Sequence, residues 1–295
     1  MRMEFMQKHC EEFGLGKMAK ILSIGRSSYY EFISRPPSKR TLRNEYLVGR
    51  IKEIYQESRR TYGSPRVHAK LKTLGESCSR RRVAKLMQKE HLQAKMRKKW
   101  KITTQPGKNT KTIVPNYLDQ KFTVEAPNTV WGSDITYVFT KEGWLYVSVV
   151  LDLFSRKVIG LSMSNSLQTA IIVKSLKQAL YNRNPKVEVM HHSDRGCQYT
   201  SEEFRVLTKE KNIKLSMSAK GRCYDNAVLE SFFHTLKTEH VHLCQFRTRE
   251  EAINSIFEYV EVFYNRKRIH STLGYLSPLD FENHWMERNQ KKMCS

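Results

Sequence analysis

The segment TVWGSDITYVFTKEGWLYVSVVLDLFSRKVIGLSM, at residues 129–163, decides the fold class. It contains three runs rich in β-branched and aromatic residues, which predict strands at 130–138, 144–151 and 158–163. Only a few polar residues separate neighbouring runs. Strands connected so tightly predict a three-strand meander.

Helices and strands alternate after this meander. The periodicity predicts a helix near 169–181, a strand at 187–190, a helix near 201–211, a strand at 213–216 and a long helix from Asp225. We expect the side chain of Asp225 or Asn226 to cap that last helix. A meander followed by alternating helices and strands indicates an α/β fold, with a mixed five-stranded sheet flanked by helices.

The first hundred residues are predicted to be all-α. Residues 17–33 place apolar side chains at helical spacing on both sides of a central glycine, with Ser27 or Ser28 available to cap the second helix. This outline fits a helix-turn-helix, and it fits a plain helical hairpin equally well. Further helices are expected at 44–57, at about 67–74 and from Ser79 onward.

Changes in composition divide the chain into five predicted parts. Residues around 103–129 are interrupted by prolines and lack sustained periodicity, which is typical of an extended linker. The parts are a helix-turn-helix-like module at 1–38, a basic helical module at 39–102, a linker at 103–125, a core with the mixed sheet at 126–240 and a basic helical C-terminal tail at 241–295.

The chain carries far more positive than negative charge. Its 295 residues include 52 Lys and Arg against 29 Asp and Glu, a net charge of +23. Residues 1–120 hold 28 basic and 10 acidic side chains, and residues 121–295 hold 24 and 19. This excess indicates a polyanionic partner, most simply nucleic acid. On composition alone, a generally basic surface, as in ribosome-associated proteins, is an equal alternative.

Cysteine spacing and hydropathy bear on the compartment. The six cysteines lie far apart without a CxxC pair, which argues against a zinc ribbon or a disulfide framework and predicts a reduced, cytoplasmic protein. No apolar stretch is long enough to span a bilayer, and no secretory signal pattern begins the chain. We therefore expect no membrane association.

A dense cluster of basic residues lies at 80–101. This segment holds ten basic residues and a single acid, Glu90. A run of charge is usually a solvated helix face, but an imbalance of this size favours contacts with phosphates, whose neutralisation releases counterions. The candidate DNA-binding residues in this segment are Arg80, Arg81, Arg82, Lys85, Lys98 and Lys99.

Three acidic residues occupy settings that suggest chemistry. Asp134 lies among hydrophobic residues in a predicted strand, where a buried carboxylate needs a cation or a hydrogen-bond donor. Asp194 lies in the polar loop that follows the next predicted strand, a position where functional groups collect. Glu230 lies on the long helix, beside apolar residues that keep the spacing of a core face.

Each acid alone has an ordinary explanation. Asp134 fits a strand-end turn, Asp194 a loop cap, and Glu230 an exposed helix acid that pairs with His234. Together, three carboxylates fit a site for two hard cations, because Mg²⁺ prefers carboxylates, water and phosphates. Glu230, His234 and Lys237 also share one helical stripe, so a metal ligand and a phosphate contact are expected side by side.

Six motifs along the chain form a recognisable set. They are WGSDIT at 131–136, HSDRGCQYTS at 192–201, YDNAVLESFFHTLK at 224–237, YGSPR at 62–66, RVAKLM at 82–87 and VFYNRKRIHSTLGYLSP at 262–278. With these motifs the chain resembles the larger-subunit (OrfB-type) transposases of the IS-three family of bacterial insertion sequences, which have a retroviral-integrase-like core. The number of residues between Asp194 and Glu230 is 35, the spacing of that family's signature. The resemblance implies that residues 126–240 are the catalytic core and that the module at 39–102 binds DNA.

The resemblance implies an RNase H-like sheet and a DDE transposase, which cleaves DNA at insertion-sequence ends and joins the freed 3′-hydroxyl to another strand. It implies that Asp134, Asp194 and Glu230 bind two Mg²⁺ ions, with Mn²⁺ able to substitute. It also implies that Lys237 binds DNA near the terminal bases. Asp152 follows a strand without a polar loop, so we exclude it from the triad and expect it to steady the sheet edge or contact Arg156.

The resemblance also implies partners and a location. The expected ligands are the terminal inverted repeats of the element and a target DNA, bound by a homodimer or a larger assembly. A smaller upstream protein with a helix-turn-helix and a coiled coil is an expected partner, and the expected location is the bacterial cytoplasm, at the nucleoid. Arg266 and Arg268 are expected on a second DNA-facing surface, with a solvated helix end as the alternative.

Two other functions fit parts of the sequence. An RNase H-like nuclease would share the sheet and the metal ions but would release hydrolysis products only. A helix-turn-helix regulator without catalysis would bind DNA through the basic modules and use the C-terminal acids for structure. The two basic helical modules and the C-terminal motif favour the transposase.

Overall fold

The computed structural model describes residues 2–95, 114–120, 122–219 and 223–293. The chain forms two compact units, one within residues 1–52 and the other within residues 53–295. The predicted DNA contacts Lys98 and Lys99 lie outside the described residues. In the described ranges, no helix has the length and apolar character needed to cross a membrane.

The first unit is helical. It contains α1 (Arg2–Phe13), α2 (Leu15–Ile21) and α3 (Arg26–Ser34), and α4 (Lys39–Glu57) begins in it and continues into the second unit. The pair α2 and α3 is the predicted helical pair, and α1 was not expected from the periodicity. The prediction of a serine cap is wrong, because Gly25 is the N-cap of α3 and no side chain caps the helix. The small core consists of Met6, Met18, Ala19 and Tyr29.

The second unit opens with a helical hairpin of α5 (Ser64–Thr73) and α6 (Arg80–Lys89), which pack against each other. Pro65 lies in the first turn of α5, where its missing N–H is not needed. Ser79 caps α6 as predicted, since its hydroxyl accepts a hydrogen bond from the Arg82 N–H at 3.2 Å. Val83, Leu86 and Met87 are buried, so the basic residues of α6 remain on its outer side.

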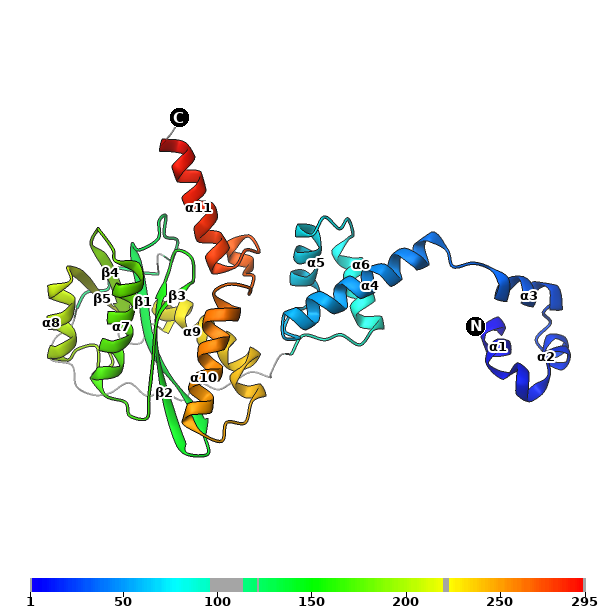
Figure 1. Ribbon diagram of the computed structural model, residues 1–295, viewed down its shortest axis with the longest axis horizontal. Coiled ribbons are helices and arrows are strands. Elements are labelled where there is room, and N and C mark those ends of the chain that lie inside the picture. Colours follow the sequence, from blue (N-terminus) through cyan, green and yellow to red (C-terminus); the bar gives the residue numbers. More distant parts are fainter. Residues whose placement is uncertain (1, 96–113, 121, 220–222, 294–295) are drawn as a thin grey trace. The chain divides into compact units, whose positions relative to one another are not determined.

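The five strands form one mixed sheet, as predicted (Figure 1). Its order is β3-β2-β1-β4-β5, with antiparallel pairing from β1 to β3 and parallel pairing of β1 with β4 and of β4 with β5. The fourth strand lies further along the chain than the predicted 187–190. The strands are β1 (Val130–Thr140), β2 (Gly143–Asp152), β3 (Val158–Ser164), β4 (Val189–Ser193) and β5 (Ile213–Met217).

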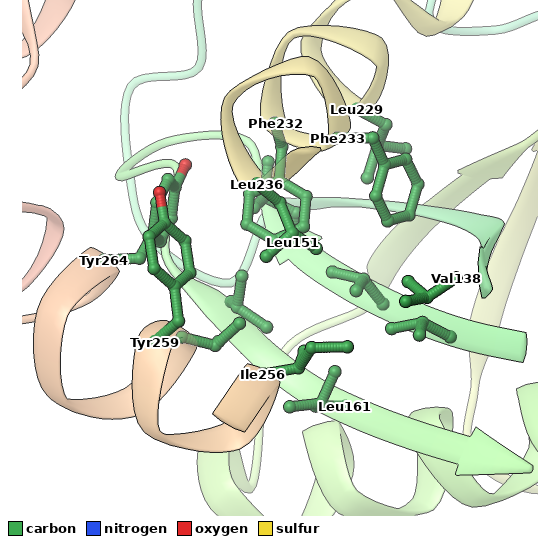
Figure 2. Packing of buried hydrophobic residues seen from close by; sticks show 14 of the residues in the cluster. Val138, Leu151, Leu161, Leu229, Phe232, Phe233, Leu236, Ile256, Tyr259 and Tyr264 are labelled. Carbon is green, nitrogen blue, oxygen red and sulfur yellow. The ribbon is translucent and has the colours of Figure 1, made fainter. Parts of the chain in front are cut away.

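Helices cover both faces of this sheet. Trp131 and Ile135 of β1 pack in the core that includes α7 (Thr169–Arg183) and α8 (Glu202–Glu210). Val130 and Val138 pack in the core that includes α9 (Ala227–Glu239) and α10 (Arg249–Glu258), and Figure 2 shows part of this second core. Alternate residues of β1 thus face opposite layers, which explains why apolar residues occur at both odd and even positions of this strand.

The segment after residue 240 is part of the second core. Ile256, Tyr259 and Tyr264 pack beside the side chains of α9 and the sheet in Figure 2. The elements that follow α9 along the chain are η2 (Val241–Leu243), α10, the π-helical turn η3 (Tyr259–Tyr264), η4 (Ser271–Leu273) and α11 (Pro278–Met293). This segment therefore contributes to the stability of the second unit.

His191 predicts an acid sensitivity of the fold. The ring is fully buried, and neither of its nitrogens has a hydrogen-bond partner among the described residues. Burial lowers the pKa of His191 from its usual 6.5 to about 3. As the pH falls, His191 therefore binds a proton in the unfolded chain before it does so in the folded one. The free energy of unfolding is highest above about pH 6.5 and decreases as the pH falls toward 3.

We expect His191→Phe to remove this loss. The apolar ring leaves no unsatisfied polar atom and cannot be protonated. At pH 4.5 the variant is expected to be more stable than the wild type by about 2 kcal/mol relative to their difference at pH 7, measured by urea unfolding. His284→Gln, at an exposed position, is the control. Equal acid sensitivity of His191→Phe and the wild type would contradict the prediction.

Candidate active site

The register of two parallel strands brings Asp134 and Asp194 together. Along the β1–β4 ladder the last pair is Ser133 with Ser193, where β4 ends. Asp134 follows Ser133 and Asp194 follows Ser193, so the two acids lie side by side where the ladder stops. Adjacent strands are only about 5 Å apart. These two predicted ligands are 60 positions apart in the sequence. The parallel pairing of β1 and β4 brings them together at the end of the ladder.

A glycine brings α9 close to the same face of β1. A Cβ atom added at Gly132 would lie 3.0 Å from Leu229 Cδ1 and 3.2 Å from Leu153 Cδ2, so the helix approaches a position that has no side chain. Asp134 is two residues further along the strand and faces the same layer. Glu230 follows Leu229 on this helix, and its negative charge helps to raise the pKa of Asp134.

The electrostatics of Asp134 are those of a crowded acidic site. Burial, together with the negative charges of Asp194 and Glu230, raises the pKa of Asp134 to about 8. The Ile135 N–H, donated at 2.7 Å, and the positive charge of Lys237 oppose this shift. Repulsion between the carboxylates is the condition under which a bound cation stabilises the site most.

The other two acids are more accessible to solvent. Asp194 and Glu230 are exposed, and partial loss of water raises the pKa of each carboxyl group. The Gly196 N–H donates to Asp194 Oδ1 at 2.9 Å, which orients the carboxylate and opposes the shift. In the described part of the chain, no three His, Cys, Asp or Glu side chains are grouped as a metal-binding cluster.

Lys237 reaches the site from the last turn of α9. Its Nζ lies 5.0 Å from the centre of the Tyr137 ring on β1. Burial lowers the pKa of Lys237, and the negative charge of Asp134 raises it. The predicted stripe of Glu230 and Lys237 thus lies beside Asp134, with a cation next to the acids where it can contact a phosphate.

The loop after β4 is anchored by hydrogen bonds. The Tyr199 hydroxyl lies 3.1 Å from Ser133 Oγ, and Arg195 Nε donates to the Ser218 carbonyl at 2.7 Å. The side chains of Tyr199 and His192 are buried beside this loop. The loop that carries Asp194 is therefore fixed to β1 on one side and to the end of β5 on the other.

Asp152 has a structural role. It is fully buried, accepts the Asn128 N–H at 2.8 Å and the Phe154 N–H at 3.0 Å, and lies 3.7 Å from the Arg183 guanidinium. Burial raises its pKa to about 6, against these three stabilising contacts. These bonds fit the expectation that Asp152 steadies the sheet edge or contacts Arg156. Its ion pair is with Arg183, and its carbonyl accepts the Arg156 N–H at 2.8 Å.

Asp225 is a residue whose role the sequence misjudged. The prediction that Asp225 or Asn226 caps α9 by its side chain is wrong, because Asn226 is the N-cap and makes no side-chain cap bond. Asp225 is buried and accepts hydrogen bonds from Asn116 Nδ2 and the Ala219 N–H, each at 2.9 Å. It ties the start of α9 to residues before β1 and after β5. Its burial could not be read from local sequence.

The predicted DNA contacts divide into two groups. Arg80, Arg81 and Lys85 are exposed on α6 and Arg82 is half-buried, so these side chains are available on or near the surface. Arg266 is also exposed. The prediction that Arg268 faces DNA is wrong, because its side chain is buried and its guanidinium binds Glu239.

Comparison with known proteins gives the family. Residues 124–223 and 230–286 match two family models described as integrase core domain, and residues 41–100 match the HTH-like domain. The chain is 38% identical over 285 residues to the transposase InsF for insertion sequence IS3A of Escherichia coli (strain K12), an alignment that covers 96% of this chain and 99% of that protein. The chain belongs to the IS3 family of transposases.

Another relative of the transposase is the uncharacterized 31 kDa protein of insertion element IS600 from Shigella sonnei. The two are 40% identical over 264 residues, which is 90% of this chain and 97% of the relative. Because the transposase matches its relatives from end to end, the helical hairpin, the sheet and the C-terminal segment all belong to the shared protein. It is therefore a DDE transposase, a polynucleotidyl transferase with an integrase-like core and an HTH-like domain.

Two solved structures from viruses align with parts of the transposase. The catalytic core domain of HTLV-2 integrase in complex with magnesium aligns with 53% of the transposase and 97% of its own chain, at 18% identity and a TM-score of 0.42. A simian T-cell lymphotropic virus intasome in complex with PP2A regulatory subunit B56 gamma aligns with 72% and 73%, at 14% identity and a TM-score of 0.47.

Proposed function

We propose that the transposase cuts and joins DNA at a site formed by Asp134, Asp194 and Glu230, which would bind two divalent metal ions. The observation that carries this proposal is the side-by-side placement of Asp134 and Asp194 where the β1–β4 ladder ends, with Glu230 close enough to raise the pKa of Asp134. Strand β1, the loop after β4 and helix α9 supply the three acids. Such a site is held rigidly.

The donor set fits magnesium. All three side chains are carboxylates, and Mg²⁺ is commonly held by one or two carboxylates with water and substrate phosphates completing its ligands. An open group of acids therefore suits this ion before DNA is bound, and Mn²⁺ is proposed to substitute. When bound, the two ions would activate the attacking oxygen and stabilise the leaving oxygen of the phosphodiester.

The protein's own residues would position the DNA. Lys237 is proposed to bind a phosphate next to the acids, while Arg80, Arg81, Arg82 and Lys85 bind the backbone of the element end. In the first reaction a water oxygen bonds to phosphorus and the 3′-oxygen leaves as a hydroxyl. In the second, that hydroxyl attacks a phosphodiester of another strand, whose own 3′-oxygen leaves. The number of phosphodiesters is unchanged in the second reaction, and no bond to the protein forms.

Further partners are proposed from the same mechanism. Both ends of an element must be brought together, so we propose a homodimer or a larger assembly on DNA that carries terminal inverted repeats. Arg266, exposed near the C-terminal segment, is proposed as another contact to target or end DNA. A smaller upstream protein with a helix-turn-helix and a coiled coil is proposed to strengthen end recognition. The proposed location is the nucleoid.

A single assay separates this function from its two alternatives. Labelled duplexes that carry candidate element ends are incubated with a second duplex and Mg²⁺, without metal, or with a chelator. We expect shortened strands and also longer, joined strands with Mg²⁺ or Mn²⁺, and neither without metal. Shortened strands alone would favour a nuclease, and binding with no cut at any metal concentration would favour a regulator.

A further inference from the structure

Glu239, the last residue of α9, joins distant parts of the second unit. This buried carboxylate accepts hydrogen bonds from Arg268 Nε at 2.7 Å and Nη2 at 2.6 Å, and from the Tyr259 hydroxyl at 3.2 Å. Arg66 Nη1 donates to it at 3.1 Å. Arg268 and Tyr259 belong to the C-terminal segment, whereas Arg66 lies in the first turn of α5.

Residues just before α5 strengthen this connection. The Tyr62 hydroxyl accepts the Ile269 N–H at 2.8 Å and donates to the Lys267 carbonyl at 3.3 Å. Arg59 forms an ion pair with Glu258, and its guanidinium lies 5.0 Å from the centre of the Phe263 ring. The start of the helical hairpin is therefore held against the catalytic core by the largely buried hydrogen bonds of Tyr62 and by the exposed ion pair of Arg59.

The charges at Glu239 are matched to one another. Burial alone would raise the pKa of Glu239, but the hydrogen bonds and positive charges of Arg268 and Arg66 lower it. A carboxylate so enclosed depends on its partners, because an unpaired buried charge is strongly unfavourable. Arg66 is the partner that comes from the hairpin. When Arg66 is replaced, Glu239 still has the positive charge of Arg268 beside it.

The same helix carries the active-site residues. α9 contains Glu230 near its start and Glu239 at its end, and nine residues of helix are about 14 Å long. The hairpin of α5 and α6 lies within the matched HTH-like domain. A DNA-reading module and the catalytic glutamate are thus connected through one rigid helix, in addition to the long chain segment that joins them in sequence.

We propose that Arg66, Glu239, Arg268 and Tyr62, which we call the Glu239 clamp, fix the distance between the DNA end held by the HTH-like module and the catalytic acids. Arg66 and Glu239 are then positioning residues that decide which phosphodiester is cut. This inference rests on the proposed function. A clamp that served folding alone would alter stability and leave the cut position unchanged.

The chain offers a matched control for this proposal. Glu282 is another buried carboxylate with two cations, Arg183 and Lys157, and both of these belong to the core. The side chains of Lys157 and Arg66 are similarly exposed, at 24% and 27%. Arg66→Gln and Lys157→Gln thus each remove the more exposed cation of a buried glutamate, but only the first removes a contact between the hairpin and the core.

The test is the position of the cut. Wild type, Arg66→Gln, Lys157→Gln and the triple variant Arg59→Gln, Tyr62→Phe, Arg66→Gln are incubated with an element-end duplex and Mg²⁺, and the new 3′ ends are mapped by sequencing. We expect the ratio of flanking cuts to correct cuts to rise about five-fold or more in Arg66→Gln and further in the triple variant. Lys157→Gln is expected to keep the wild-type position.

The outcomes separate the two proposals. If the wild type cuts at one position and Arg66→Gln and the triple variant do the same, the clamp proposal is overturned and the proposed function stands. An equal spread of cuts in Lys157→Gln would also overturn it. A wild type that makes no metal-dependent cut would instead overturn the proposed function.

A second measurement does not require cutting. Hydrogen exchange of the α9 amides is compared with and without the end duplex, in the absence of metal. We expect DNA to slow exchange in α9 of the wild type and of Lys157→Gln by about five-fold or more, and to slow it less in Arg66→Gln. The same protection in all three proteins, or none in the wild type, would overturn the clamp proposal.

Discussion

Asp134→Asn, Asp194→Asn and Glu230→Gln are each expected to lower the rate of DNA joining by the transposase on the order of a thousand-fold. Each removes a negative charge that the proposed metal site needs, and such a loss corresponds to about 4 kcal/mol of transition-state stabilisation. The amide side chains keep the size of the originals but carry no negative charge. The rate of strand transfer on element-end duplexes with Mg²⁺ measures the effect. The loss should affect cleavage and joining alike, since one site is proposed to perform both.

The control is Glu210→Gln, which removes an exposed carboxylate from α8 on the other side of the sheet. It should join DNA at the wild-type rate. DNA binding, measured by gel shift without metal, should persist in all four variants, because the basic residues are unchanged. Joining at the wild-type rate by any one of the three site variants would remove that residue from the triad.

A titration tests the arrangement of the acids without any reaction. The charge of Asp194 helps to raise the pKa of Asp134 to about 8. Replacing Asp194 with asparagine removes this repulsion, so the pKa of Asp134 is expected to fall in the metal-free protein, as measured by NMR of the carboxyl carbon. An unchanged pKa would mean that the two carboxylates are further apart than the register of β1 and β4 indicates.

Gly160→Ala is expected to destabilise the catalytic unit by about 3 kcal/mol or more and to lower its melting temperature by about 10 °C. Gly160 lies in β3 directly against α7, and an added Cβ would be 2.1 Å from the Ser175 carbonyl oxygen and 3.1 Å from Ala179 Cβ. The clash is with helix backbone, so no side-chain rotation relieves it. Either α7 moves away from the sheet or the strand bends.

Two hydrogen bonds limit that movement. Leu161 N–H donates to Gln178 Oε1 at 2.8 Å, and Asn182 Nδ2 donates to the Ile159 carbonyl at 2.9 Å, so α7 is tied to β3 on both sides of the glycine. Thermal unfolding followed by circular dichroism measures the loss. Gly49→Ala is the matched control, because a Cβ there meets nothing within 4 Å and alanine favours the helix. A Gly160→Ala protein that melts like the wild type would contradict the proposed close approach.

Much of the fold followed from local sequence. Runs of β-branched and aromatic residues, and the periodicity after them, predicted all five strands. Helical periodicity with the cap at Ser79 predicted α6. The predicted fourth strand began and ended too early, because its last residues are two histidines and a serine that are buried only by neighbouring elements. The serine cap of α3 failed because Gly25 took the N-cap position.

The sequence predicted which residues form the candidate site and did not predict how they are arranged. Asp134, Asp194 and Glu230 were selected from their settings and from the family signature, and their chemical roles stay predictions. Arg268 shows the limit of such selection, since a basic residue in a basic segment was taken as surface and is in fact enclosed around Glu239. No local pattern distinguishes it from Arg266, which is exposed.

The sequence by itself determined the order of helices and strands, the excess of basic charge and the family, because each depends on residues a few positions apart or on composition. Only the tertiary structure decided which charged groups are buried together. Arg66 and Glu239 are separated by 173 positions, and Asp134 and Asp194 meet only through the register of two parallel strands. The free energy of a buried charge depends on its partner, and packing of distant segments decides which partner is present.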